Sequence, residues 1–364
     1  KRGLEMVEVI RQPAEITKEW LTQALCSTGA IQSSVTHVEP LIIGEGVGLM
    51  AQLARLSITY AKPESAPTTM IAKFAANNEN KAVAQALDFY NRETNFYNHI
   101  GDESELRVPS SYFGAVDPDT YDFVLLLEDL GEVSPNDQLI GASEAEAYAA
   151  IELIAIQHAR YWQKVRTPTT SWMYDMMGEA GTAMLQNALY RPSLEPTLEK
   201  FESFFTPKTR HIAQAVGDRF GEFWGGNVTA QETFVHGDYR QDNMIYPPGS
   251  LNAIVMDWQI CGVGRSIFDV TYFICQSLQP ALRKAIERPL LQRYVARLKE
   301  GGVHTYDFDE VWHDYRVVML GCLLYPMTVC GSLDLSNARG RGLAECMLER
   351  NLAAIEELGC EEFI

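Results

Sequence analysis

The sequence predicts an α+β protein with two lobes, an N-terminal antiparallel sheet with one inserted helix and a mostly helical C-terminal part. Three observations lead to this prediction. Short apolar stretches bounded by turn residues recur between residues 35 and 127, and one helical stretch interrupts them. After residue 143 the apolar residues recur at three- and four-residue intervals instead. The chain of 364 residues is long enough for two domains. We place the lobes at 1–130 and 131–364, with a hinge at about 127–131.

The composition is that of an ordinary globular protein. Hydrophobic residues make up 46% of the chain and charged residues 21%, which suffices for a substantial core. The 30 basic residues face 48 acidic ones, so the net charge is −18. A chain this acidic is a poor candidate for binding nucleic acid or an anionic membrane. Its acidity indicates either solubility or a cationic substrate.

The seven cysteines do not indicate disulfides or a metal cluster. Their number is odd, no CxxC pair occurs and several lie in apolar runs, so we expect reduced, buried thiols and a cytoplasmic location. The residues from Lys1 to Glu5 do not open the apolar region of a signal peptide, and we expect none. The longest uncharged run, 317–333, favours a buried helix, with a kink at Pro326 as one option, over a membrane span.

The N-terminal lobe begins with a predicted helix over 11–30, with Thr17 as N-cap and Gly29 as its C-terminal stop. Predicted strands follow at 35–43, 49–60, 69–75, 108–116 and 122–127. A glycine-spaced turn, which holds Gly44, Gly46 and Gly48, separates the first two. Such a turn is either an ordinary hairpin or a cover over the phosphates of a nucleotide.

Lys73 and Glu93 are two charged residues in apolar surroundings. Lys73 interrupts an apolar strand, so it lies either at a solvated edge or beside an anion. Glu93 lies on the apolar face of the predicted helix 81–100, between Phe89 and Tyr97. A buried acid is costly without a partner, and Lys73 is the obvious one. Such a pair would hold the lysine near the α- and β-phosphates of a nucleotide.

The C-terminal lobe is predicted to open with a long helix that ends near Gln163, because Ser143 and Glu146 form a capping box. On this helix His158 is interpreted as a satisfied core histidine rather than a ligand or base. Residues 164–230 are an insertion rich in Met and aromatic residues, which form either core or a substrate-specific lid. Further helices are predicted at 281–299, 308–329 and 343–358.

The segment 234–243 carries the most specific pattern in the chain. His236, Asp238 and Asn243 match the phosphoryl-transfer loop H-x-D-x-x-x-x-N, and Asp257 follows 19 residues after Asp238. Transfer needs one carboxylate to accept or orient a hydroxyl proton. It also needs an amide oxygen and a second carboxylate to hold Mg²⁺ against the triphosphate of ATP.

In order and spacing, nearly the whole chain resembles the aminoglycoside phosphotransferase and choline kinase-like family, which has a bilobal protein-kinase-like fold. The form Asp257-Trp258-Gln259 and the hinge Glu128-Asp129-Leu130 look most similar to the ecdysteroid-kinase-like branch and its bacterial relatives. The residues that carry the resemblance are Lys73, Glu93, 127–130, 236–243, 257–259 and Asp269.

The resemblance implies a role for each of these residues. Asp238 would be the catalytic base, Asn243 and Asp257 would hold Mg²⁺, and Lys73, braced by Glu93, would contact the phosphates. Gly44 to Gly48 would cover the phosphates, and backbone groups near Glu128 and Leu130 would bind adenine. His236 would pack the loop, and Asp269 would brace it by hydrogen bonds. Arg240 would either neutralise phosphate or pair with Asp242, and we favour the pair.

The spacing after Asp257 bears on the substrate. Asp269 follows only 12 positions after Asp257, which leaves too little chain for a long activation loop and a peptide platform. We therefore expect the acceptor to be a hydroxyl of a small molecule. It would be a hydroxylated apolar metabolite such as a sterol or hydroxyacyl-CoA, or alternatively an aminoglycoside or another cationic antibiotic. An inactive nucleotide-binding pseudokinase is the alternative of another class.

Overall fold

The computed structural model describes residues 7–43, 51–77, 80–131, 136–332, 335 and 338–364. The chain forms two compact units, each described here by itself. The N-terminal unit consists of Lys1–Val133 together with Met256–Ile260, and the C-terminal unit consists of Ser134–Val255 and Cys261–Ile364. The short segment 256–260 therefore belongs to the first unit, although its sequence neighbours belong to the second.

The N-terminal unit is built on a five-stranded antiparallel sheet with the strand order β1-β2-β3-β5-β4. Its strands are β1 (Val35–Ile43), β2 (Ala51–Tyr60), β3 (Thr69–Ala75), β4 (Ser111–Val116) and β5 (Phe123–Glu128). All five predicted strands are present, with β4 starting three residues later than expected. Continuous apolar sequence places β5 between two neighbours, and five of its six residues are buried.

The first helix, α1 (Lys18–Thr28), begins after the predicted N-cap Thr17 and ends before the predicted stop Gly29. The Thr17 side chain accepts a hydrogen bond from the Trp20 amide, and Gly29 ends the helix in the left-handed conformation with φ +80°. The helix is shorter than the predicted 11–30, because the residues before Thr17 form only a 3-10 turn at Pro13–Glu15.

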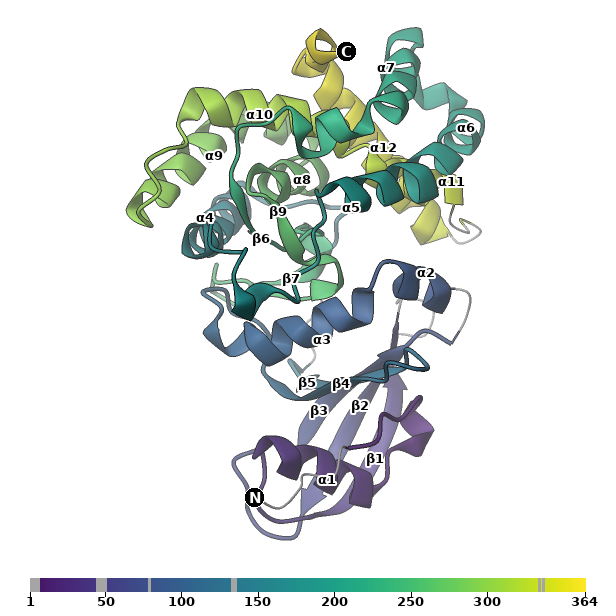
Figure 1. The fold of residues 1–364 in the computed structure, drawn as a ribbon, viewed down its shortest axis with the longest axis vertical. Coiled ribbons are helices and arrows are strands. Elements are labelled where there is room, and N and C mark those ends of the chain that lie inside the picture. Colours follow the sequence, from purple (N-terminus) through teal and green to yellow (C-terminus); the bar gives the residue numbers. More distant parts are fainter. Residues whose placement is uncertain (1–6, 44–50, 78–79, 132–135, 333–334, 336–337) are drawn as a thin grey trace. The chain divides into compact units, whose positions relative to one another are not determined.

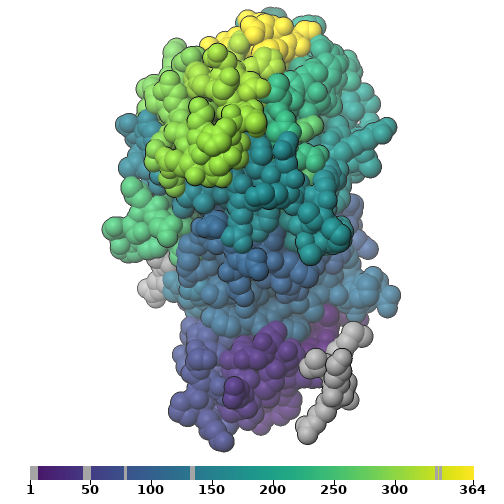
Figure 2. Space-filling model, turned by 60° about the vertical axis from the view of Figure 1, so that its left-hand side comes forward, coloured from purple at the N-terminus to yellow at the C-terminus, as the bar shows by residue number. Residues whose placement is uncertain are grey.

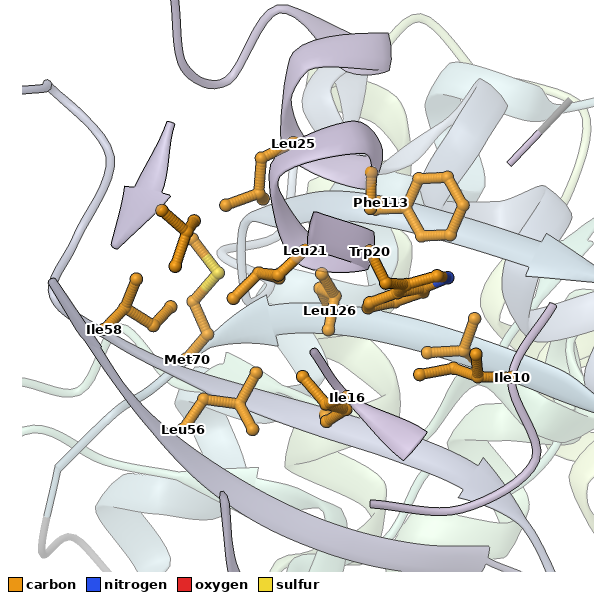
Figure 3. Close-up of a cluster of buried hydrophobic side chains, with 14 of the residues drawn as sticks. Ile10, Ile16, Trp20, Leu21, Leu25, Leu56, Ile58, Met70, Phe113 and Leu126 are labelled. Carbon is orange, nitrogen blue, oxygen red and sulfur yellow. The ribbon is translucent and has the colours of Figure 1, made fainter. Parts of the chain in front are cut away.

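One face of the sheet forms an apolar core with α1. Leu21 and Leu25 of α1 are fully buried against alternate residues of the strands, and the Trp20 ring meets Phe113 edge-on at 5.9 Å (Figure 3). In β3 the residues on this side are Met70, Ala72 and Phe74. Lys73 therefore points to the opposite face, which α3 covers (Figure 1).

The helical segment inserted between β3 and β4 is interrupted. It consists of α2 (Asn80–Ala86) and α3 (Phe89–His99), where one continuous helix over 81–100 was expected. Asp88 separates them with φ +57°, a left-handed conformation that Asp tolerates better than most residues. The break starts a new helix whose buried face carries Arg92, Glu93 and Phe96.

The C-terminal unit is mostly helical. Its helices are α4 (Glu144–Tyr161), α5 (Glu179–Met184), α6 (Arg191–Lys200), α7 (Pro207–Asp218), α8 (Ile267–Ser277), α9 (Pro280–Glu300), α10 (Phe308–Gly321), α11 (Leu324–Ser332) and α12 (Ala338–Glu357). The predicted capping box opens α4, with Ser143 and Glu146 bonded reciprocally. Within this unit α4 packs on α9 and α6 packs on α11 (Figure 1). The chain around residue 300, at the end of α9, lies on the surface (Figure 2).

Two short antiparallel ladders support the predicted catalytic segment. One pairs β6 (Glu232–Val235) with β9 (Gly262–Arg265), and the other pairs β7 (Met244–Ile245) with β8 (Ile254–Val255). Residues 236–243 thus start directly after one strand and end directly before another. The ladders hold both ends of the segment at defined positions.

The predicted helix 308–329 is divided in two. The break lies at Cys322 and Leu323, four residues before the expected kink at Pro326. Pro326 has no amide hydrogen, and its ring would clash with the carbonyl of residue 322, so the proline is accommodated in the first turn of a new helix. Among the described residues, the stretch Phe308–Ser332 alone is long and apolar enough to span a membrane, and 67% of its most apolar window is buried in the fold.

The cysteines form no disulfide. Five of the seven are buried, Cys346 is half-buried and Cys26 is exposed. Burial raises the pKa of the Cys275, Cys330 and Cys360 thiols to about 12. They behave as small apolar core residues, as predicted.

Candidate active site

The predicted pair of Lys73 and Glu93 is present in the N-terminal unit. The Lys73 Nζ atom lies 2.8 Å from Glu93 Oε1. Strand β3 supplies the lysine and helix α3 the acid, so the pair joins the sheet to the helix that covers it. The Glu93 side chain is 1% exposed and that of Lys73 11% exposed, so both members of the pair are largely shielded from solvent.

Asp257 completes this charged cluster. Its Oδ1 atom lies 3.3 Å from Lys73 Nζ, and its side chain is 44% exposed. The residue has φ +62°, a left-handed conformation. We infer that this turn lets the Asp257 carboxylate face Lys73 while the next residue, Trp258, faces α3.

The segment after Asp257 is attached to α3 by aromatic stacking and by a hydrogen bond. The Trp258 ring stacks on Phe96, with centroids 3.9 Å apart and an interplanar angle of 7°. The Arg92 guanidinium donates to the Ile260 carbonyl. Trp258 is fully buried. The packing thus places Asp257 beside Lys73 and Glu93, which no sequence pattern indicated.

The charges of this cluster stabilise one another. Burial disfavours the ammonium of Lys73, but Asp257 and Glu93 outweigh burial and raise the pKa of Lys73. Burial raises the pKa of Glu93, and Lys73 opposes that rise. The result is a lysine that stays charged, with Glu93 and the partly exposed Asp257 carboxylate beside it.

The remaining residues predicted to contact the nucleotide are Glu128, Leu130 and the three glycines of the turn after β1. The Glu128 side chain at the end of β5 pairs with Arg107 at 2.6 Å, and its own amide donates to the Ser110 carbonyl. Leu130, two residues further on, is half-buried. The predicted phosphate-covering residues Gly44, Gly46 and Gly48 lie outside the described residues.

In the C-terminal unit, Asp269 of α8 holds the start of the predicted catalytic segment. Its carboxylate accepts hydrogen bonds from the amides of His236 at 2.7 Å and Gly237 at 2.9 Å. It also lies 3.2 Å from Nε2 of His158, whose Nδ1 lies 2.9 Å from the Tyr294 hydroxyl. Asp269 and His158 are fully buried, so His158 is the satisfied core histidine that we predicted.

The catalytic segment also fixes its own backbone. The Asp238 amide donates to Nδ1 of His236 at 3.2 Å. The Asn243 side-chain amide donates to the Asp238 carbonyl at 2.8 Å and to Asp238 Oδ2 at 2.9 Å. A left-handed Gly237, with φ +85°, makes the turn between these contacts. The six-residue stretch from Asp238 to Asn243 is therefore a closed, hydrogen-bonded loop.

Arg240 pairs with two carboxylates of this loop. Its Nε atom lies 3.0 Å from Asp238 Oδ1, and its Nη1 atom lies 2.8 Å from Asp242 Oδ2. Asp242 in turn accepts the Gln138 amide at 2.7 Å. Both Asp238 oxygens thus have a donor, Arg240 on one and Asn243 on the other, and the carboxylate is held in one orientation.

The donor set suits a hard divalent cation such as Mg²⁺. Asn243 uses its side-chain nitrogen for both bonds to Asp238, so the amide oxygen points away from that residue. The Asp257 carboxylate is partly exposed. Amide and carboxylate oxygens are the ligands that Mg²⁺ prefers. Asn243 and Asp257 belong to different units, and each by itself offers an oxygen of the kind that the predicted metal would need.

The structure adds contacts that sequence reasoning did not find. Gln138 reaches Asp242 from more than 100 residues away, and Tyr325 donates from its hydroxyl to the Gly237 carbonyl. The Arg107 guanidinium donates a hydrogen bond to the Glu128 carboxylate. None of these residues lies in a local motif. For Tyr325, the sequence shows only that it lies next to Pro326 in an uncharged run, and this does not predict a contact with Gly237.

The chain also matches a known protein family. The sequence profile of the ecdysteroid kinase-like family matches residues 45–304, which include the Lys73, Glu93 and Asp257 cluster and the loop 236–243 with Asp269, but not Tyr325. The chain belongs to the ecdysteroid kinase-like family. The suspected resemblance is thereby confirmed, and the chain is a member of a small-molecule kinase-like family. No curated protein sequence matches the chain significantly.

Solved structures confirm the fold class for this family member. A proposed aminoglycoside phosphotransferase from Ralstonia eutropha JMP134 superposes with a TM-score of 0.53 at 15% identity, covering 94% of this chain and 97% of that one. A GDP complex of a point mutant of aminoglycoside 2'-phosphotransferase-IIIa gives a TM-score of 0.52 at 12% identity, covering 95% and 99%. At these identities the likeness shows the kinase-like fold alone.

Proposed function

We propose that this member of the ecdysteroid kinase-like family transfers the γ-phosphoryl group of ATP to a hydroxyl group of a small molecule. The observation that carries the proposal is the fixed Asp238 carboxylate in the loop 236–243. Asp238 Oδ1 is held by Arg240 and Oδ2 by Asn243. An oriented carboxylate is what a hydroxyl acceptor needs in order to lose its proton as the phosphoryl group arrives.

Each cluster has a role in this reaction. The charged Lys73, held by Glu93 and Asp257, would bind the α- and β-phosphates of ATP. Mg²⁺, when bound, would supply positive charge against the triphosphate, with Asn243 and Asp257 as its protein ligands. Asp238 would orient the acceptor hydroxyl and accept its proton. Most of the rate enhancement would then come from positioning and charge neutralisation.

Arg240 has a role that follows from its two partners. It neutralises part of the charge of Asp238 and Asp242, two acids of the same loop, at 3.0 and 2.8 Å. Without it, the two carboxylates would repel each other and the incoming phosphates. We propose that Arg240 keeps the loop compact by ion pairing.

For the acceptor, we propose a hydroxylated apolar metabolite, sterol-like or a hydroxyacyl-CoA, used in the cytoplasm. Family membership supports this class, since the profile is that of ecdysteroid kinase-like proteins. The aromatic residues of the insertion add little support, because Phe201, Phe220 and Trp224 are buried within the fold. The fold neighbours among aminoglycoside phosphotransferases, together with the net charge of −18, favour a cationic antibiotic as the second candidate.

The proposal is tested by ADP release in the presence of ATP and Mg²⁺ with a panel of ecdysteroid-like sterols, hydroxyacyl-CoAs, choline and aminoglycosides. One class should stimulate release, and Asp238→Asn should abolish that stimulation while ATP still binds. Asp218→Asn, which changes an exposed aspartate at the end of α7, is the control and should keep full activity. Stimulated release that survives in Asp238→Asn would refute the assignment. ATP binding without turnover on any acceptor would support the pseudokinase alternative.

A further inference from the structure

Tyr325 has a position in the C-terminal unit that the proposed reaction does not yet use. It lies in the first turn of α11 and is half-buried. Its hydroxyl donates a hydrogen bond to the Gly237 carbonyl. Gly237 is the residue directly before Asp238, so the bond acts on the peptide group that carries the amide of the proposed base.

With Tyr325, each peptide group around the base has a fixed partner. Asp269 binds the amides of His236 and Gly237, and Asn243 binds the Asp238 carbonyl. In the Gly237–Asp238 peptide, the amide donates to Nδ1 of His236 and the carbonyl accepts from Tyr325. Gly237 has a left-handed φ of +85° and no side chain, so this bond restrains a residue with little conformational preference of its own.

Helix α8 holds the Tyr325 ring in place. The ring centroid lies 4.3 Å from that of Tyr272 and 6.2 Å from that of Phe268. Tyr272 and Phe268 are on the same helix as Asp269, and both are buried. These ring contacts keep the side chain of Tyr325 beside α8, with its hydroxyl at the Gly237 carbonyl.

The other end of this connection is the inserted segment. Helix α11 packs against α6, which belongs to the insertion 164–230 (Figure 1). The Thr197 hydroxyl donates to the Met327 carbonyl at 3.1 Å, and the Ser193 and Ser332 hydroxyls lie 2.6 Å apart. At Gly331 an added side chain would overlap the backbone of Ser193, so the two helices are in close contact. Helices α6 and α11 should therefore move together.

We propose that Tyr325 is a positioning residue that couples the α6–α11 helix pair to the Asp238 carboxylate through the Gly237 peptide. An acceptor that contacts this helix pair would thereby set the orientation of the base. The inference rests on the proposed function, in which Asp238 is the base.

The test compares Tyr325→Phe with Tyr190→Phe. Both substitutions remove one hydroxyl that donates to a backbone carbonyl. Tyr190, which is fully buried, donates to Ala213 at 2.9 Å and touches no residue of the catalytic loop in the described contacts. Two measurements are made on the full chain, amide hydrogen exchange of the peptide covering 234–243 and hydrolysis of Mg²⁺-ATP with water as acceptor.

In Tyr325→Phe we expect exchange of the loop amides to rise about tenfold, because the Gly237 peptide loses its restraint. The kcat of hydrolysis should fall about five- to twentyfold with the KM for ATP unchanged, since the nucleotide contacts are intact. In Tyr190→Phe both quantities should stay within twofold of the wild-type values. Equal loop exchange in the two variants, or a loop that loosens without a change in kcat, would overturn the coupling.

The outcome separates this inference from the proposed function. A wild-type protein that binds ATP and transfers its phosphoryl group to no acceptor of the panel would count against phosphoryl transfer, while loop exchange would still decide whether Tyr325 restrains Gly237. Conversely, if amide hydrogen exchange of the loop is unchanged in Tyr325→Phe and phosphoryl transfer is normal, Tyr325 has no positioning role, while the proposed reaction is unaffected.

Discussion

In the N-terminal unit the candidate site is a set of charged side chains, whereas in the C-terminal unit it is a backbone loop. Lys73, Glu93 and Asp257 come from three elements that contribute one charge each, and attraction between the charges keeps them together. The loop 236–243 has the ion pairs of Arg240, but its backbone is held by hydrogen bonds between its peptide groups and Asp269, Asn243 and Tyr325.

This difference predicts how substitutions impair each of the two parts. A charged cluster loses function when one charge is removed, because its partner is left buried and uncompensated. A hydrogen-bonded loop loses order when an acceptor or donor is removed, because buried amides are left without partners. The substitutions below test the contrast, from the largest expected effect to the smallest.

Asp269→Ala should have the largest effect. It removes an acceptor of two buried amides, and we expect a loss of about 3–5 kcal/mol in the free energy of unfolding, measured by urea denaturation. Asp314→Ala is the matched control, because Asp314 is also fully buried and binds two amides, those of Thr229 and Ala230. Both variants should lose stability, whereas only Asp269→Ala should slow ATP hydrolysis by the folded protein. Equal slowing in the two would contradict a specific role for the loop.

Lys73→Met should remove nucleotide binding and destabilise the fold. It leaves the buried Glu93 without its cation, at a cost of about 3 kcal/mol or more. The double variant Lys73→Met with Glu93→Gln removes that unpaired charge, so part of the stability should return while ATP affinity does not. Thermal unfolding and ATP titration by calorimetry measure the two effects. If the double variant is no more stable than Lys73→Met, the charges do not stabilise each other as described.

Trp258→Leu tests the attachment of Asp257 to α3. Loss of the stack on Phe96 should cost about 2–4 kcal/mol and lower ATP affinity in the presence of Mg²⁺. Trp258→Phe keeps an aromatic ring at 258 and should fall between this variant and the wild type. An ATP affinity that is insensitive to both changes would mean that Asp257 reaches its position without Trp258.

The smallest effect concerns pH. Asp257 and Glu93 outweigh burial and raise the pKa of Lys73 above its ordinary value of 10.5. A raised pKa in the folded state means that the contribution of the charge is fully present below the unfolded value and is lost only as pH rises through the folded value. The stability difference between wild type and the double variant Lys73→Met with Glu93→Gln, in which no unpaired Glu93 can titrate, should therefore be constant from about pH 7 to 9.5. The difference is measured by urea denaturation at several pH values. If it declines between pH 7 and 9.5, Lys73 loses its proton at a lower pH than described.

Much of the fold and part of the candidate site follow from local sequence. Strand alternation, the Thr17 and Ser143 caps and the apolar run of β5 act between residues close in the chain, so their patterns predict the elements directly. The contact of Asp238 with Asn243 is equally local, since Asn243 is five positions after Asp238. The pairing of Lys73 with Glu93 could be expected because two buried opposite charges in adjacent elements need each other.

The sequence by itself thus determined the elements, the catalytic motif and the charges that must be neutralised. The tertiary structure decided which distant groups meet, such as Asp257 with Lys73, 184 residues apart, and Tyr325 with Gly237, 88 residues apart. It also decided where helices break, at Asp88 and Cys322. The physical reason is that these contacts depend on how side chains pack between elements, and packing leaves no periodic signal along the chain.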